Sequence, residues 1–175
     1  TTYPLNLSYT NSLGSMICDG AFPVYGPDVD WGQDEYFLAK SLANQSLSDN
    51  VHILPQPIDS PLTGSIAVTA SGLWERKWLA HFQHSQRIGG AWLLYSIDDK
   101  AMRSLVDTDK PSLEKCTAYL QWLVYSRRYD EAFRESMRFG KHHNSLHFYG
   151  ALAQVARGQY ENAVPLFKKA KRGKW

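Results

Sequence analysis

Positive charge is almost absent from the N-terminal part of this 175-residue chain, residues 1–70. Lys40 is the only basic residue there, against seven acidic ones, whereas the rest of the chain carries 18 Lys and Arg against ten acids. The small net charge of +2 therefore hides an acidic first part and a basic second part. Such asymmetry is typical of a chain that meets an acidic partner, a nucleic acid or a membrane surface, or whose own halves attract each other.

Cysteines and long apolar runs are also scarce. Cys18 and Cys116 fit no zinc-knuckle or redox spacing and allow at most one disulfide. No apolar stretch reaches the roughly 18 residues of a membrane helix, and no signal peptide is recognisable. The chain starts at Thr1 and ends in a lysine-rich stretch at Trp175. We therefore expect a soluble fragment of a longer protein, without a membrane span.

Short catalytic signatures are missing as well. The sequence holds no Gly-x-Ser-x-Gly elbow, no phosphate-binding glycine loop before a helix and no dinucleotide fingerprint. We therefore assign no catalytic residue and expect no cofactor. An enzyme with its site in residues 1–100 stays as a minor hypothesis, because sites without short motifs leave no mark in a single sequence.

Two groups of residues have the types that bind metal ions. Asp28, Asp30 and Asp34 alternate around a glycine, as in acidic calcium loops, but the distal glutamate of such loops is missing. His143 and His147 lie four apart on an expected helix, yet no glutamate follows the first histidine and no third ligand is evident. We therefore predict no metal site, with helix-starting acids in the first group and solvent-exposed histidines in the second.

Four tryptophans lie among the basic residues Arg76, Lys77, Arg87, Arg127 and Arg128. Such a mixture can stack on bases and neutralise single-stranded nucleic acid. The tryptophans concerned are Trp74, Trp78, Trp92 and Trp122. Because aromatic residues at helical spacing more often form core, nucleic-acid binding is disfavoured.

The first half of the chain has patterns of both helix and strand. Glycines and prolines divide residues 1–31 and favour extended segments and turns. Acids followed by apolar residues at helical spacing predict a helix over 33–46. Residues 51–54 and 63–69 have the apolar and β-branched character of strands.

The patterns between residues 73 and 106 are more ambiguous. Residues 73–82 fit a helix, with the second strand of a hairpin as the alternative. The apolar run at 91–95 is too short to assign by periodicity, and residues 98–106 begin like a helix.

Residues 111–175 are predicted to be helical throughout. A helix opened by Ser112 is expected to end near Arg127, with Cys116, Tyr119, Leu120 and Leu123 on one face. The next helix starts at Tyr129 and stops at Gly140, a residue suited to the left-handed conformation at a helix end.

The same pattern then returns. A helix over 145–157 stops at Gly158, and Tyr160 starts another helix as Tyr129 does. The interval from Tyr129 to Tyr160 is the period of the repeat, and the chain therefore contains two helical hairpins in succession.

These two units resemble tetratricopeptide repeats, in which small residues let two antiparallel helices approach closely. The matching residues are Tyr129-Asp130-Glu131-Ala132 in the first unit, and Gly150, Gly158-Gln159-Tyr160-Glu161-Asn162-Ala163, Phe167 and Ala170 in the second. The resemblance implies that Ala132, Ala163 and Ala170 keep the helices close and that Tyr129 and Tyr160 fill the core at the turns. The chain departs from the family in its shorter period, in Ser136, where a larger residue is usual, and in Pro165 within the last helix.

In this family the first helix of each hairpin lines the inner surface. The resemblance therefore implies a candidate recognition face made of Glu114, Thr117, Gln121, Tyr125, Phe148 and Leu152. The alternative for Phe148 and Leu152 is that they are ordinary core residues.

The sequence thus predicts an α+β protein, with a mixed α/β region at 1–107 packed on a tetratricopeptide-like helical array at 108–175. We expect a protein-protein interaction module that binds a protein or peptide partner, with the basic second half as a candidate contact for an acidic surface. The alternative is an extracytoplasmic ligand- or pH-sensing region of a membrane-anchored regulator. The charge asymmetry, the six histidines and a Cys18–Cys116 bridge would support that alternative.

Overall fold

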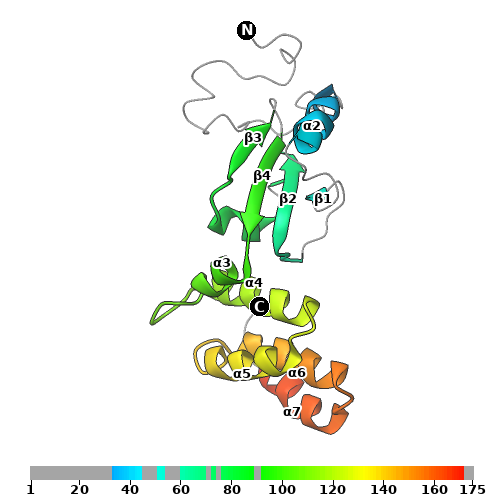
Figure 1. Cartoon of the computed structure of the whole chain (residues 1–175). Helices are drawn as coiled ribbons and strands as arrows, with labels where there is room; N and C mark the ends of the chain where they lie inside the picture. The colour runs from blue at the N-terminus through cyan, green and yellow to red at the C-terminus, as the bar shows by residue number, and fades with distance from the viewer. Residues whose placement is uncertain are drawn as a thin grey trace. The chain divides into compact units, whose positions relative to one another are not determined.

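The computed structural model describes residues 33–44, 51–53, 60–69, 72–73, 76–88 and 92–171. The predictions for residues 1–31 and for the acidic loop that begins at Asp28 lie outside these residues. Within them, Figure 1 shows a β-sheet followed by helices to the end of the described chain. This arrangement confirms the predicted α+β class.

The chain divides into two compact units. The first comprises residues 1–59 and 63–98, and the second comprises residues 60–62 and 99–175. The change of unit at Asp98–Asp99 comes earlier than the predicted boundary after residue 107, so the helix that follows Asp98 belongs to the helical unit.

The first unit contains a four-stranded mixed sheet. Its strands are β1 (Val51–Ile53), β2 (Gly64–Thr69), β3 (Gln86–Ile88) and β4 (Trp92–Ile97), in the order β1-β2-β4-β3. β1 runs parallel to β2, and the other two neighbouring pairs are antiparallel. The strands predicted at 51–54 and 63–69 are confirmed, and the unassigned apolar run at 91–95 belongs to β4.

Both faces of this sheet carry buried apolar side chains. The predicted first helix is confirmed as α2 (Gln33–Asn44), and its Leu38 packs in one cluster with Ala67. Because side chains alternate along a strand, Ile66 and Val68 point to the opposite face, where both are fully buried. A sheet buried on both faces reads as a continuous apolar run rather than an alternating one.

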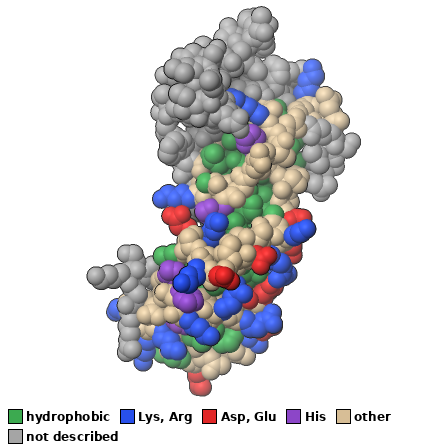
Figure 2. Space-filling view, turned by 90° about the vertical axis from the view of Figure 1, so that its left-hand side faces the viewer, with side chains coloured by type: hydrophobic (Ala, Val, Ile, Leu, Met, Phe, Trp, Pro, Cys, Tyr) green, Lys and Arg blue, Asp and Glu red, His purple; other side chains and the backbone are tan. Residues whose placement is uncertain are grey.

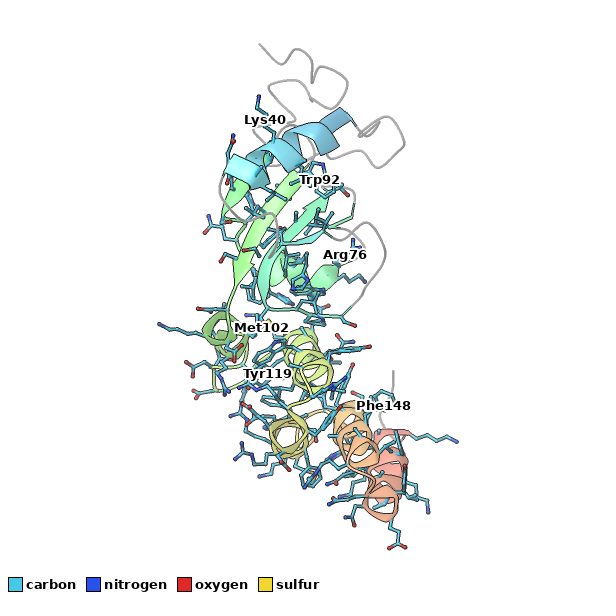
Figure 3. All side chains as sticks on the ribbon, turned by 45° about the vertical axis from the view of Figure 1, so that its right-hand side comes forward. Lys40, Arg76, Trp92, Met102, Tyr119 and Phe148 are labelled. Carbon is cyan, nitrogen blue, oxygen red and sulfur yellow. The ribbon has the colours of Figure 1, made fainter. Side chains whose placement is uncertain are left out.

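The helix predicted over 73–82 is shorter in the structure. The described part is a 3₁₀ helix, η1 (Lys77–His81), in which Trp78 and Leu79 are buried. Arg76 precedes it and is also buried, and its Nη1 donates to the carbonyl oxygen of Gly72 at 2.8 Å. Figure 3 labels Arg76 beside the strands of this unit.

The second unit is helical. Its helices are α3 (Asp99–Ser104), α4 (Leu113–Tyr125), α5 (Tyr129–Phe139), α6 (His147–Ala156) and α7 (Tyr160–Lys171), with a 3₁₀ turn, η2 (Asn144–Leu146), before α6. Consecutive helices from α4 to α7 pack against each other, and α4 also contacts α6. Short turns join α4 to α5 and α6 to α7, so each pair forms a helical hairpin.

The start of α4 follows its sequence signal. Ser112 caps the helix, and its side chain accepts a hydrogen bond from the backbone N–H of Lys115. A serine cap of this kind contributes about 1 kcal/mol to helix stability. The four residues predicted to share one face, Cys116, Tyr119, Leu120 and Leu123, are all buried.

The two hairpin turns have the same backbone geometry at equivalent positions of the repeat. Arg127 and Gly158 both adopt a positive φ, of 60° and 73°. The backbone hydrogen bonds run from Ser126 to Trp122, Arg127 to Val124, Arg128 to Leu123 and Ala132 to Arg128 in the first turn, and from Arg157 to Ala153, Gly158 to Val155, Gln159 to Gln154 and Ala163 to Gln159 in the second. Each turn is therefore a Schellman motif, and the period found in the sequence is also a structural period.

Gly140 does not adopt the left-handed conformation predicted for it. Its φ of −60° and ψ of −16° are those of a right-handed helix. A β-carbon at this position would lie 2.7 Å from each ring nitrogen of His147. Gly140 is therefore required by the close approach of the His147 ring.

Small residues also determine how α5 meets α6. Ser136 is fully buried, and its hydroxyl donates to the carbonyl oxygen of Phe133 at 2.7 Å. The Ser136 side chain lies directly against Gly150, where a β-carbon would clash with it. The serine that departs from the tetratricopeptide pattern thus faces the residue with no side chain.

Candidate functional site

The six residues of the candidate recognition face lie on two helices that contact each other. Glu114, Thr117, Gln121 and Tyr125 belong to α4, and Phe148 and Leu152 belong to α6. Phe148 takes the place of Thr117 one repeat later, and Leu152 takes the place of Gln121. Equivalent positions of the two hairpins therefore contribute to this face.

None of these six side chains is buried. Glu114 is exposed, and Tyr125 is 61% exposed at the end of α4. Phe148 and Leu152 are half-buried. The Phe148 ring meets the Phe167 ring of α7 edge-on at 5.8 Å, and Figure 3 labels Phe148 among the C-terminal helices.

An ion-pair network joins α3, α4 and α5. The Glu131 carboxylate accepts a hydrogen bond from the Tyr119 hydroxyl at 3.2 Å and pairs with Arg103 at 2.6 Å. Arg128 pairs with Glu131 at 3.3 Å and with Asp99 at 2.7 Å. Burial, with a further contribution from the Glu131 charge, raises the pKa of Tyr119 to about 12. The network links α4 to α3 and α5 and leaves Tyr119 a neutral hydrogen-bond donor.

A cavity of about 290 Å³ opens beside this network. Its lining residues are Lys100, Arg103, Ser104, Val106, Asp107, Tyr119, Glu135 and Arg138. Arg103 pairs with Glu131, and Arg138 pairs with Glu135 at 3.0 Å. Because these pairs offset the positive charge of the lining, the cavity has no clear preference for an anion.

A second cavity, of about 280 Å³, contains the Cys116 thiol. Its other lining residues are Lys110, Pro111, Phe139, His142 and His143. Cys116 is a free, buried cysteine, so it does not support the Cys18–Cys116 bridge considered for the sensor hypothesis. Cys18 itself lies outside the described residues. Burial raises the pKa of the Cys116 thiol to about 11, so the thiolate is not available as a nucleophile at neutral pH.

His147 contradicts the prediction of solvent-exposed histidines. It is 6% exposed, at the start of α6 and against Gly140. Burial lowers its pKa, and the charge of Lys169 lowers it further. Within the described residues, no group of three or more His, Cys, Asp and Glu side chains is placed to hold a metal ion.

Three of the four tryptophans considered for nucleic-acid stacking are core residues. Trp78 and Trp92 are 4% exposed and Trp122 is 2% exposed, while Trp74 lies outside the described residues. Arg128 lies over the Trp122 ring, 4.8 Å from its centre. These three rings are therefore not presented to a base.

Charge is mixed on the visible surface of the helical unit. Figure 2 shows lysine and arginine side chains interspersed there with acidic and histidine side chains. The net positive charge of this half thus forms no single uninterrupted basic patch on that face.

The main error of the sequence-based prediction concerns Tyr160, expected in the core at the second turn. It is 65% exposed, whereas the equivalent Tyr129 is half-buried. The repeat period could have revealed this difference. The hairpin that contains Tyr129 is followed by a second hairpin that packs against it, whereas Tyr160 starts the last described helix.

Comparison of the chain with protein-family models, curated proteins and solved structures finds no match. The tetratricopeptide resemblance therefore stays a prediction from the residues of this chain. In the described part of the chain, every helix is too short or too polar to cross a membrane.

Proposed function

We propose that this chain is a protein-interaction module whose helical unit binds a peptide or a partner domain at the recognition face. The observation that supports this proposal is the contact between α4 and α6. In the proposed arrangement, matching and partly exposed positions of the two hairpins share one side of the unit and together contact an extended or helical ligand.

The chemistry of the face suits protein recognition. Tyr125 and Phe148 are accessible aromatic side chains, the type that most often anchors a protein interface. Thr117 and Gln121 lie on the same helix as Tyr125 and can exchange hydrogen bonds with a ligand backbone, and Glu114 adds one negative charge. The tetratricopeptide resemblance assigns the same helices to ligand binding.

The test is selection of ligands from a displayed peptide library, followed by affinity measurements with variants. Tyr125→Ala should lower the affinity for the selected ligands by at least about tenfold, as expected for an aromatic anchor, with little change in the melting temperature of the protein. Gln121→Ala should act in the same direction with a smaller effect.

Ile53→Ala is the control, because Ile53 is an exposed apolar side chain, 48% accessible, but lies on β1 in the first unit. It should leave these affinities unchanged. If Tyr125→Ala lowers stability as much as binding, or if Ile53→Ala has the same effect on binding, the recognition face is wrongly assigned.

A sensor of pH is the second candidate function, and buried His147 is the observation that favours it. A histidine kept neutral by burial and by Lys169 couples the packing of α6 to proton concentration. A steep loss of stability between pH 7.5 and 5 would support this function, and a flat profile would remove its basis.

A further inference from the structure

The open side of the second hairpin differs from the equivalent side of the first. In the first hairpin these positions are held by Val124, Tyr129, Phe133 and Ser136, of which the first three are half-buried and the last is buried. In the second they are held by Val155, Tyr160, Val164 and Phe167, of which the first three are 36%, 65% and 51% exposed. Apolar positions that are covered in one hairpin are therefore open in the other.

The first hairpin shows what covers such a side. α6 packs on α5, and the half-buried Phe133 and Met137 pack against the cluster that Ala151 of α6 forms with Ala163 and Leu166 of α7. The helices approach most closely where Ser136 meets Gly150. The natural occupant of this kind of surface is therefore an α-helix with a small residue at the point of closest approach.

We propose that the open side of the second hairpin, formed by Val155, Tyr160, Val164 and Phe167, binds an acidic amphipathic α-helix of a partner protein. This helix lies antiparallel to α7, as α6 follows α5 through a turn. Phe167 takes the place of Ser136, so the partner helix needs glycine or alanine opposite it.

The charge of the partner follows from the last turn of α7. Lys168 takes the place of the partly buried Met137, and Lys171 is exposed on the same side of α7 as Val164. In an antiparallel arrangement the first turn of the partner helix meets these lysines. Two interactions favour acidic residues in the first turn of the partner helix: attraction to the lysines and attraction to the positive end of the dipole of that helix.

A second copy of this chain is a poorer occupant. The first turn of α7 offers Glu161 as its acidic residue, against the three lysines of the last turn. Two α7 helices packed against each other would therefore bring together a surplus of positive charge. The partner surface goes beyond the recognition face, because the four residues that form it are not among the six assigned there.

The probe is a synthetic peptide that copies residues 144–157, the η2–α6 segment, with N144E and S145E to give an acidic first turn. Amide chemical shifts of the isotope-labelled protein should change around Tyr160, Val164 and Phe167 when this peptide is added. Affinity should fall as salt is raised, and a peptide that also carries G150L should not bind.

The decisive protein variants are Val164→Asp and Asn162→Asp. Both add one negative charge to exposed positions of α7, but residue 162 lies about 160° around the helix from residue 164. V164D should lower the affinity for the peptide by at least about tenfold. N162D should leave this affinity within about twofold of that of the unmodified protein.

Several results would overturn the proposal. Equal affinity for V164D and unmodified protein, shift changes away from α7, or an absence of binding would each reject the partner helix. Dimerisation of the protein alone that V164D abolishes would make a second copy the occupant. Because Tyr125→Ala should not affect this peptide, failure here and failure of the recognition face are separate results.

Discussion

The hydroxyl oxygen of Ser136 lies where a β-carbon on Gly150 would have to sit. Ser136 belongs to α5 and Gly150 to α6, and both are buried. The distance between these two helices therefore depends on the absence of one methyl group. The same closeness allows Ala151, Ala163 and Leu166 to form a single apolar cluster with the side chains around them.

Replacing Gly150 by valine should lower the free energy of unfolding by about 1–3 kcal/mol, because the added methyl groups overpack the α5–α6 contact. Urea denaturation measures the change. Ala156→Val in the exposed part of the same helix is the control and should cost only its helix propensity, about 0.5 kcal/mol. Equal losses for the two variants would show that packing at Gly150 is not special.

Arg127 and Gly158 give a matched pair of opposite predictions. Both have a positive φ at the same position of a Schellman motif. Arg127→Gly should stabilise the protein by about 0.5–1 kcal/mol, because the left-handed conformation costs an L-residue about 1–2 kcal/mol and the greater freedom of glycine in the unfolded chain returns part of that. Gly158→Ala should destabilise it by about 1 kcal/mol. A loss of stability in Arg127→Gly would mean that the arginine side chain contributes more than the strain.

Glu131→Gln should lower the pKa of Tyr119, which is about 12, while leaving it above the ordinary value of 10, because burial is the larger cause of the shift. The phenolate absorbance, taken as the difference from Tyr119→Phe, measures this pKa. In the native protein, stability that is complete below pH 10 falls as pH rises from 10 toward 12, because only the unfolded chain ionises there. An unchanged pKa would mean that the Glu131 contact has no effect on Tyr119.

Glu131→Gln should also cost about 1 kcal/mol of stability, since two partly exposed arginines lose their partner. Asp130→Asn is the control. It removes a pair with Arg157 at 2.9 Å, but the Asp130 side chain is 82% exposed, so the change should stay below about 0.5 kcal/mol.

His147 should make the folded state sensitive to acid. Burial and the charge of Lys169 lower its pKa, while a histidine in the unfolded chain titrates near 6.5. The contribution of neutral His147 to the free energy of unfolding is complete above pH 6.5. It falls as pH decreases from 6.5 toward the folded-state pKa, because only the unfolded state takes up the proton in this range. The slope reaches at most about 1.4 kcal/mol per pH unit.

Thermal or urea unfolding between pH 7.5 and 5 tests this prediction. His147→Gln keeps a polar side chain without a titrating ring and should flatten the profile. His142→Gln changes an exposed histidine and should leave it as it is. Identical profiles for all three proteins would place the acid sensitivity elsewhere.

Features with local signals were predictable from the sequence. The Ser112 cap starts α4, and Gly158 ends α6, because the hydrogen bonds they make or permit involve residues within one helical turn. The repeat of Tyr129 at Tyr160 likewise located both hairpins. The recognition face came from the tetratricopeptide resemblance, and none of its six side chains is buried.

The failures came from contacts between residues that the sequence does not pair. Gly140 was predicted to end α5 in a left-handed conformation, but its conformation is that of a right-handed helix. Glycine is needed there because the His147 ring approaches it closely. The same contact buries the histidine that its polarity suggested was exposed. β4 could not be assigned, because Trp92 and Leu93 are buried on opposite faces of the sheet and no alternating pattern remains.

The pairing of β2 with β4 has a consequence for the order of folding. Gly64 must meet Ile97 to close this ladder, whereas each helix from α4 to α7 packs on its neighbour along the chain. Contacts between distant residues form slowly, so the helical unit should become compact first during refolding. Stopped-flow fluorescence of variants that keep a single tryptophan can follow this order, with Trp122 reporting on the helices and Trp92 on the sheet. If Trp122 is buried first, both surfaces proposed for binding exist while the sheet is still unfolded, and a partner can act on a half-formed protein.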